Sequence, residues 1–348
     1  KAERKRAPLI QTIRECIRKD VERLTKIGSR FDASVLTYTV DDLIEEFRRY
    51  VREYTLFNYM ENVIAGLRHS KKNRTSETYR SALNSFRKFR QGKDILLDSL
   101  TPGIIESYEA WHKSRGVVPN TISFYMRILR AVYNRAVEDS IIEDCNPFRR
   151  VYTGIDKTVK RALPLSVVKK IKSLDLSLKP TLNYARDMFL MSFYLRGMSF
   201  VDMAFLKKSD LKNGYIIYRR RKTGQQLIIK WTVEMQTILN RYPDNPCGYL
   251  LPVIRKSKVN ERSCYRNAAY NINHSLKIIA GMVGVAMPLT LYVARHSWAS
   301  AAKAKGIPLP VISEGMGHDS ETTTRIYLAS LDTSVVDKAN TIILKSLR

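Results

Sequence analysis

Hydrophobic residues recur at intervals of three and four along most of the chain, which predicts a mainly helical protein. The first such stretch runs through Ile10, Ile13, Ile17 and Val21, and its opposite face is rich in lysine and arginine. These positions predict one basic amphipathic helix over residues 1 to 28. The helix is either a connector from a preceding binding module or an ordinary solvated surface helix.

A bundle of four more helices is expected next. The pattern Thr39-Val-Asp-Asp42 is a capping box, in which side-chain and backbone groups at a helix start satisfy one another. Further helices are predicted from near Thr75, from Pro102 at a first helical position, and from Asn120 acting as a cap. Short polar loops join these helices, so they predict a compact bundle.

The second half of the chain combines helices with a β-hairpin. The helical periodicity of hydrophobic residues stops in a basic stretch, residues 146–164, and this predicts a linker. An apolar helix is expected over residues 181–195, and two β-rich runs flank a Thr-Gly turn within residues 214–231. The predicted fold is mainly α with a small β-sheet in an α+β second domain. The expected divisions are a basic helix with linker (1–35), a helical bundle (36–145), a basic linker (146–164) and the α+β domain (165–348).

The charge of the chain is strongly positive. Its 348 residues include 60 Lys and Arg against 33 Asp and Glu, a formal net charge of +27, and the excess is spread along the sequence. A long polyanion that touches several surfaces is the expected partner, and nucleic acid fits this description. The alternatives are a merely basic protein and a membrane-surface binder, although no apolar run reaches the length of about 18 residues that indicates a membrane span.

The cysteines predict no disulfide framework. They are far apart and form no C-x-x-C pair, which predicts reduced thiols in the core and a cytoplasmic protein without a signal peptide. No His, Cys or acidic cluster has metal-ligand spacing, so neither a metal nor another cofactor is expected. The four cysteines are Cys16, Cys145, Cys247 and Cys264.

Candidate chemistry lies near the end of the sequence. The segments Arg295-His296 and Gly317-His318, with Tyr327 nine residues after His318, place an Arg, a His and a Tyr on neighbouring predicted helices. A tyrosine hydroxyl, with an ordinary pKa of about 10, needs help to attack. Cations give that help when the target is a phosphodiester, whose non-bridging oxygens gain charge in the transition state.

This order of motifs resembles the tyrosine recombinase (phage integrase) family, and the resemblance covers about residue 36 to the end. It implies that Arg295 clamps the phosphate, that His318 forms hydrogen bonds and handles protons, and that Tyr327 is the nucleophile. It also implies that Lys222, at the hairpin tip, protonates the leaving 5′-oxygen. The plain alternative for Lys222 is one more phosphate contact.

Two positions depart from the family pattern. Tyr292 stands where the family usually has a His, and it can hydrogen-bond a phosphate but will not carry protons near neutrality. Ser199 stands in the slot of the first catalytic arginine, with Asp202 at the usual acidic position after it. Arg196, about one helical turn earlier, is expected to present its guanidinium there instead. Otherwise Arg196 is a helix-end arginine that reaches solvent.

The predicted bundle matches the family's core-binding domain, which lies over one face of the DNA while the catalytic domain covers the other. Basic and amide side chains on both domains are therefore candidate DNA contacts, with ordinary surface charge as the alternative. The candidates are Lys72, Arg74, Arg80, Arg87, Asn120, Arg127, Arg161, Arg221 and Arg266.

The resemblance implies a site-specific DNA recombinase, an integrase or invertase of the kind carried by conjugative or phage-like elements, that works through a 3′-phosphotyrosine. Type IB topoisomerase-like relaxation and a catalytically silent DNA-binding protein are the alternatives. The expected partners are double-stranded DNA with recombination sites, a homotetramer of the chain, and accessory DNA-bending or directionality proteins.

Both ends of the sequence raise further expectations. An apolar stripe between Val335 and Leu344 is expected to dock on a neighbouring subunit, or else to pack on its own chain. The sequence starts at Lys1 rather than at a methionine, which leaves open whether an arm-binding domain precedes it.

Overall fold

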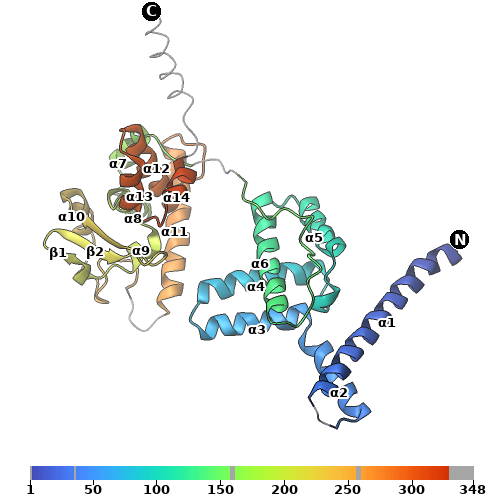
Figure 1. The fold of residues 1–348 in the computed structure, drawn as a ribbon. Helices are drawn as coiled ribbons and strands as arrows, with labels where there is room; N and C mark the ends of the chain where they lie inside the picture. The colour runs from blue at the N-terminus through green and yellow to red at the C-terminus, as the bar shows by residue number, and fades with distance from the viewer. Residues whose placement is uncertain (1, 35–36, 157–160, 256–259, 329–348) are drawn as a thin grey trace, which may run out of the picture. The chain divides into compact units, whose positions relative to one another are not determined.

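The structure is a computed structural model that describes residues 2–34, 37–156, 161–255 and 260–328. The chain divides into two compact units, residues 1–157 and 158–348. Figure 1 colours the first from blue to green and the second from green to red. The predicted apolar stripe after Tyr327 lies outside the described residues.

The first unit is helical and has one core. Leu56, Phe86, Tyr108 and Leu129 are fully buried in it and come from four different helices. The predicted bundle is present, but it contains a helix, α3, that the periodicity did not predict. The helices are α1 (Ala2–Ala33), α2 (Val40–Glu53), α3 (Leu56–His69), α4 (Asn73–Phe89), the 3-10 turn η1 (Leu97–Ser99), α5 (Pro102–Ser114) and α6 (Pro119–Glu138).

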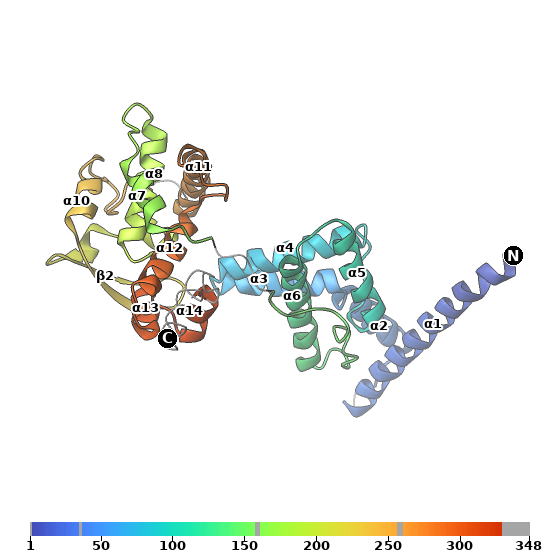
Figure 2. The ribbon, with the colours of Figure 1, turned by 90° about the horizontal axis from the view of Figure 1, so that it is seen from above.

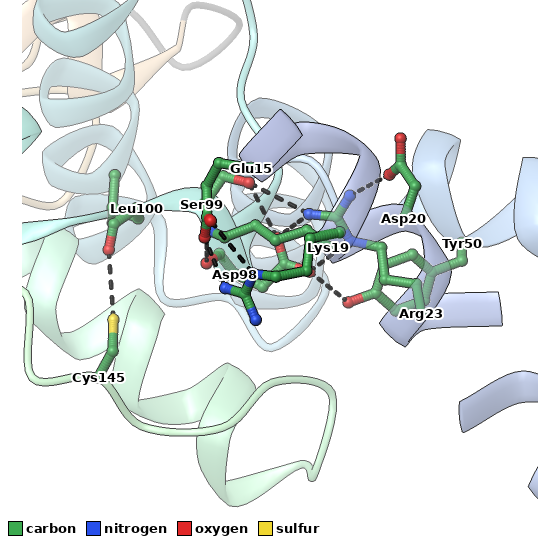
Figure 3. A network of polar contacts seen from close by, with 10 residues as sticks. Glu15, Lys19, Asp20, Arg23, Tyr50, Asp98, Ser99, Leu100 and Cys145 are labelled. Atoms are coloured by element: carbon green, nitrogen blue, oxygen red, sulfur yellow. Dashed lines mark hydrogen bonds and ion pairs between the residues drawn. The ribbon is translucent and has the colours of Figure 1, made fainter. Parts of the chain in front are cut away.

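Helix α1 is joined to the bundle by a buried arginine. Arg23 donates from Nε and Nη2 to the two carboxylate oxygens of Asp98, at 2.7 and 2.5 Å, and the Tyr50 hydroxyl donates to the same carboxylate at 3.3 Å. Figure 3 shows Arg23 between Asp20 and Asp98. The helix passes through Gly28, where the sequence predicted its end, and Ile27 is buried beside that glycine.

The segment predicted to begin the linker packs on the first unit. Phe148 is buried in the bundle core, and the Ser123 hydroxyl donates to the carbonyl of Gly154. Asn120 does not cap α6, which begins at Pro119. Its amide instead accepts from the backbone N–H of Asp156 at 2.8 Å and donates to the Asp156 carbonyl at 3.0 Å. Asn120 therefore fastens this segment rather than starting the helix.

The second unit surrounds an apolar helix with further helices and a three-stranded antiparallel sheet of order β1-β2-β3. Met188 and Phe189 of α8 are fully buried, because this helix is covered on most sides. Figures 1 and 2 both show α12, α13 and α14 gathered together. The elements are α7 (Leu165–Ser173), α8 (Pro180–Tyr194), α9 (Phe200–Ala204), the 3-10 turn η2 (Lys208–Asp210), β1 (Leu211–Lys212), β2 (Tyr215–Arg219), β3 (Gln226–Lys230), α10 (Val233–Leu239), α11 (Glu261–Met282), α12 (Leu291–Ala304), α13 (Leu309–Met316) and α14 (Glu321–Leu328).

The cysteines are less buried than expected. Cys145 is an exposed free thiol, and Cys247 and Cys264 are half-buried free thiols. The prediction of core thiols is therefore wrong for Cys145. Across the residues that the structure describes, none of the helices combines the length and apolar character needed to cross a membrane.

Candidate active site

Arg295 is the most enclosed cation of the site. It lies on α12, whose first N–H is capped at 2.9 Å by the side-chain oxygen of Asn273, and only 3% of its surface is exposed. Its Nη1 donates to the Gly197 carbonyl at 2.8 Å, and its Nη2 donates to the Met316 carbonyl at 2.7 Å. Its buried Nε has no hydrogen-bond partner among the described residues. The guanidinium is thus held firmly, with one donor group left over.

His318 accepts a hydrogen bond from the same guanidinium. Arg295 Nη2 lies 2.8 Å from His318 Nε2, and an arginine can only donate, so Nε2 carries a lone pair. The ring proton is therefore on Nδ1, which lies 2.7 Å from the Thr324 hydroxyl. Burial, followed by the charges of Arg295, Arg220 and Lys222, lowers the pKa of His318 to about 4. The imidazole is neutral at physiological pH.

A tight turn after α8 brings the backbone against Arg295. Arg196 and Gly197 both have positive φ angles, 57° and 73°, a conformation that costs a non-glycine residue about 1 kcal/mol or more. A Cβ on Gly197 would lie 2.7 Å from the Arg295 Cα, so no side chain fits there. Arg196 is half-buried, and its Cδ lies 3.8 Å from where a Cβ on Gly315 of α13 would stand.

Lys222 is exposed at the tip of the predicted hairpin. The loop is closed by backbone hydrogen bonds of 2.8 Å, from Arg220 to Gln225 and from Gly224 to Arg220. Thr223, the residue after Lys222, donates from its hydroxyl to the Gly317 carbonyl at 3.4 Å, which holds the hairpin tip beside His318. The charge of Lys222 contributes to lowering the pKa of His318. The structure thus brings Lys222, His318 and Arg295 to one region.

Arg220 was missed by the sequence analysis. Side chains in β2 alternate, with Ile216 and Tyr218 buried, and Arg220 continues that parity one step beyond the strand. It is 6% exposed, and its Nη1 donates to the carbonyl of Gly317, the left-handed residue that ends α13. The alternation of buried and exposed side chains along β2 was the available signal for Arg220. Because three arginines follow one another, from Arg219 to Arg221, the sequence did not show which of them faces inward.

Ser199 and its neighbours form a support for the hairpin. The Ser199 hydroxyl donates to Asp202 Oδ2 at 2.6 Å and is the N-cap of α9. The other oxygen of Asp202 accepts the backbone N–H of Arg221 at 2.9 Å. The guanidinium of Arg221 lies over the Phe205 ring, 4.2 Å from its centroid. The Ser199 hydroxyl is therefore used in a hydrogen bond that positions Asp202 beneath the hairpin backbone.

Tyr292 lies one turn before Arg295 on α12, with 54% of its surface exposed and the rest covered. Its ring meets that of His296 edge-on, with centroids 4.8 Å apart. Partial burial raises the pKa of Tyr292, and the nearby charges of Arg295 and Arg220 oppose this rise. The hydroxyl is therefore protonated near neutrality and can act as a donor.

The candidate nucleophile Tyr327 lies on α14, three residues after Thr324. Thr324 is fully buried and is the residue that meets His318 Nδ1. Lys303 of α12 donates to the carbonyl of Leu328, the last residue of α14, at 2.8 Å. These contacts attach the helix that carries Tyr327 to both the imidazole and the arginine helix.

The candidate DNA contacts of the first unit have mixed surroundings. Lys72 and Arg74 are exposed at the start of α4, where Arg74 lies 3.7 Å from Glu77. Arg80 and Arg87 both pair with Glu61 and are partly buried. Of the others, Asn120 holds the segment at Asp156, and Arg127 Nε donates to the Ser123 carbonyl at 3.4 Å. The exposed pair at α4 is the part of this set most open to a ligand.

In the second unit, Arg161 and Arg266 are exposed, and Arg266 lies on α11. Arg221 is exposed but stacked on Phe205. Together with Lys222, they add positive charge to the surface of this unit. Their DNA contacts remain predictions.

The arrangement suits a tetrahedral anion. Burial and then the charge of Arg220 lower the pKa of Arg295 to about 10, so Arg295 remains cationic at neutral pH. Among the described residues, neither guanidinium has a carboxylate partner in an ion pair within 4.0 Å. A phosphate diester brings the missing negative charge, and a tyrosine on the adjoining helix is a candidate nucleophile for it.

Two families match the sequence. Residues 55–153 match the phage integrase SAM-like domain, and residues 169–334 match the phage integrase family. Together the matched segments take up more than half of the chain. The tyrosine recombinase XerD of Listeria innocua is 25% identical over 245 residues, which cover 66% of this chain and 78% of that relative.

Two solved structures share the fold. A lambda integrase tetramer bound to a Holliday junction has a TM-score of 0.59 at 18% identity, with 78% of this chain and 77% of that chain covered. The Tn1549 transposon integrase in complex with a circular intermediate DNA also has a TM-score of 0.59 at 18% identity, covering 84% of this chain and 99% of that one. Each likeness is to the mainly helical fold with a small sheet that the sequence predicted, so the prediction of fold class is confirmed.

Proposed function

The chain belongs to the phage integrase family of tyrosine recombinases, and from that premise we propose how its residues cut and rejoin DNA. It is a site-specific DNA recombinase. Among the alternatives, neither topoisomerase-like relaxation nor silent DNA binding has a structural observation in its favour.

One observation carries the proposal. Arg295 donates to His318, His318 faces Thr324, and Thr324 lies one helical turn before Tyr327. The phosphate clamp and the helix of the nucleophile are therefore linked by two consecutive hydrogen bonds. This link supports the assignment of Arg295, His318 and Tyr327 to one active site.

In the cleavage step the Tyr327 oxygen forms a bond to the scissile phosphorus, and the bond from phosphorus to the 5′-oxygen breaks. The products are a 3′-phosphotyrosine and a free 5′-hydroxyl. His318 Nε2 takes the phenolic proton in exchange for its hydrogen bond from Arg295, and Lys222 supplies a proton to the 5′-oxygen. One phosphoester replaces another, so the step needs no external energy source and reverses during rejoining.

The cations stabilise charge on the non-bridging oxygens. Arg295 is the first donor, and Tyr292 adds a hydroxyl donor from the same helix. Arg196 is the residue proposed from the sequence for the second guanidinium, because Ser199 cannot provide one. Ser199 keeps Asp202 and the hairpin backbone in place.

Double-stranded DNA is the partner, and the exposed cations on both units are proposed to contact its phosphates. The lambda integrase structure is a tetramer on a Holliday junction. By analogy we propose that four copies of this chain complete strand exchange, with accessory DNA-bending or directionality proteins setting the direction. The proposed setting is a mobile element, as for the transposon integrase of the same fold.

Covalent capture tests the proposal. The protein is incubated with a pool of duplexes that carry a randomised centre and a nick in one strand. A nick near the cleavage point lets the short fragment with the 5′-hydroxyl leave, so that rejoining cannot reverse the step. Adducts are separated under denaturing conditions, and the attached DNA is sequenced to recover the site.

Wild-type protein should yield an adduct on a restricted set of sequences. Tyr327→Phe should bind the recovered duplex as wild type does but form no adduct, because one hydroxyl is lost while the phosphate contacts remain. An adduct formed by Tyr327→Phe would refute the nucleophile assignment.

A further inference from the structure

Two buried arginines are held side by side at the end of α13. Arg295 Nη2 donates to the carbonyl of Met316, and Arg220 Nη1 donates to the carbonyl of Gly317, the next residue. The last carbonyls of a helix carry its partial negative charge and attract cations. Since the two acceptors are consecutive, the two guanidinium groups are fixed close to one another.

Nearby negative charge does not neutralise this pair. Asp202 is the carboxylate whose charge acts on Arg295, but its two oxygens already accept from Ser199 and from the backbone of Arg221. Among the described residues, neither Arg220 nor Arg295 forms a carboxylate ion pair. Two like charges with little solvent raise the free energy of the folded protein until an anion arrives.

Arg196 is placed differently. Its Cδ lies near Gly315, inside α13, rather than at the two carbonyls that end this helix. The charges that lower the pKa of His318 belong to Arg295, Arg220 and Lys222. Arg220 donates to the carbonyl of Gly317, the residue before His318, and this contact places it beside the imidazole segment.

We infer that Arg220 is the second phosphate-binding guanidinium, a catalytic residue that takes over from the arginine missing at Ser199. Arg295 and Arg220 would each contact one non-bridging oxygen of the scissile phosphate. The hairpin then contributes two cations, with Arg220 directed to the phosphate and Lys222 to the leaving oxygen. This inference rests on the proposed recombinase reaction.

The chemical test removes the charge from the DNA instead of from the protein. In a methylphosphonate a methyl group replaces one non-bridging oxygen, so the diester is neutral and needs less positive charge. The substrate is the duplex recovered by covalent capture, made with either a phosphodiester or a methylphosphonate at the scissile position. The rate of adduct formation is measured at saturating protein, which separates chemistry from binding.

Arg220→Ala should slow cleavage of the phosphodiester by about 10²–10³-fold, and of the methylphosphonate by less than about tenfold. Arg220→Met repeats the test with a side chain that fills the buried space, in case the alanine variant does not fold. Arg219→Ala is the matched control, since Arg219 is the exposed last residue of β2 and precedes Arg220 in the chain. It should cleave the two substrates in the wild-type ratio.

Arg196→Ala in the same assay decides between the two candidates. A small effect of Arg196→Ala beside a large, methylphosphonate-rescued effect of Arg220→Ala supports the inference. The reverse pattern, or equal losses of Arg220→Ala and Arg220→Met on both substrates, overturns it. If wild-type protein forms no adduct with any duplex, the proposed reaction itself fails, which is a separate outcome.

Discussion

His318 Nδ1 and the Thr324 hydroxyl lie 2.7 Å apart, and this hydrogen bond joins the Gly-His motif to the helix that carries Tyr327. The bond also selects the ring tautomer. With Nδ1 protonated toward Thr324, Nε2 keeps the lone pair that accepts from Arg295. One buried hydroxyl thereby orients the imidazole and, through it, the guanidinium.

Thr324→Val should slow cleavage and destabilise the fold. Valine has the same shape but cannot accept, which leaves a buried N–H unpaired at a cost of about 1–3 kcal/mol. Thr324→Ser is the control, because it keeps the hydroxyl and should stay near wild type. Urea denaturation and single-turnover cleavage measure the two effects. Equal behaviour of the valine and serine variants would show that the hydrogen bond does not matter.

Stability should fall as pH drops from about 6.5 to about 4. The ordinary pKa of histidine is 6.5 and that of folded His318 is about 4, so the unfolded chain binds more protons in this window. The neutral imidazole thus contributes stability that is complete above pH 6.5 and lost toward pH 4. Chemical denaturation across this range should show a steeper decline for wild type than for His318→Gln. Parallel curves would contradict the low pKa.

Gly197→Ala should be far more damaging than an ordinary glycine substitution. Its Cβ would lie 2.7 Å from the Arg295 Cα, and the φ of 73° adds strain. Gly214→Ala is the control, with φ of 76° and open space around its Cβ, and should cost about 1–2 kcal/mol. Gly197→Ala should cost about 1–3 kcal/mol more through overpacking and abolish adduct formation. Thermal unfolding of both variants, with capture assays, checks this difference.

Asp98→Asn should loosen α1 from the first unit while leaving the bundle folded. It weakens the bidentate pairing with Arg23, a charged hydrogen bond of about 2 kcal/mol. Hydrogen exchange of residues 20–33 should accelerate, and exchange in α6 should stay unchanged. Glu15→Gln, which alters an exposed ion pair with Arg18, provides the control. Unchanged exchange in α1 would mean that apolar packing around Ile27 suffices.

Sequence patterns predicted the long amphipathic helices better than they predicted contacts. Helix α3 escaped notice because Thr55 forms no side-chain cap and no Gly or Pro separates α3 from α2. Asn120 has the residue type of a helix cap, but its long-range partner at Asp156 decides its role. Such a pairing depends on the fold and leaves no local signal.

In the candidate active site, too, contacts that depend on the fold left no local signal in the sequence. Helical spacing suggested Arg196 as the replacement for the missing arginine, yet two consecutive left-handed residues turn the chain at that point. Strand alternation at Ile216 and Tyr218 does extend to Arg220, but only the packed structure reveals the carbonyl it meets. The motif residues could therefore be proposed from sequence, whereas the proposal of Arg220 required the packed structure.

The paired guanidinium groups at the end of α13 imply a conflict between thermal tolerance and activity. Replacing Arg220 with a neutral side chain that fills the same buried space relieves its repulsion with Arg295 in the free protein, but it removes a donor that stabilises the transition state. A selection for heat resistance alone would therefore collect inactive variants at this position. Selection for recombination has the opposite effect, and it keeps the protein less stable than its fold allows.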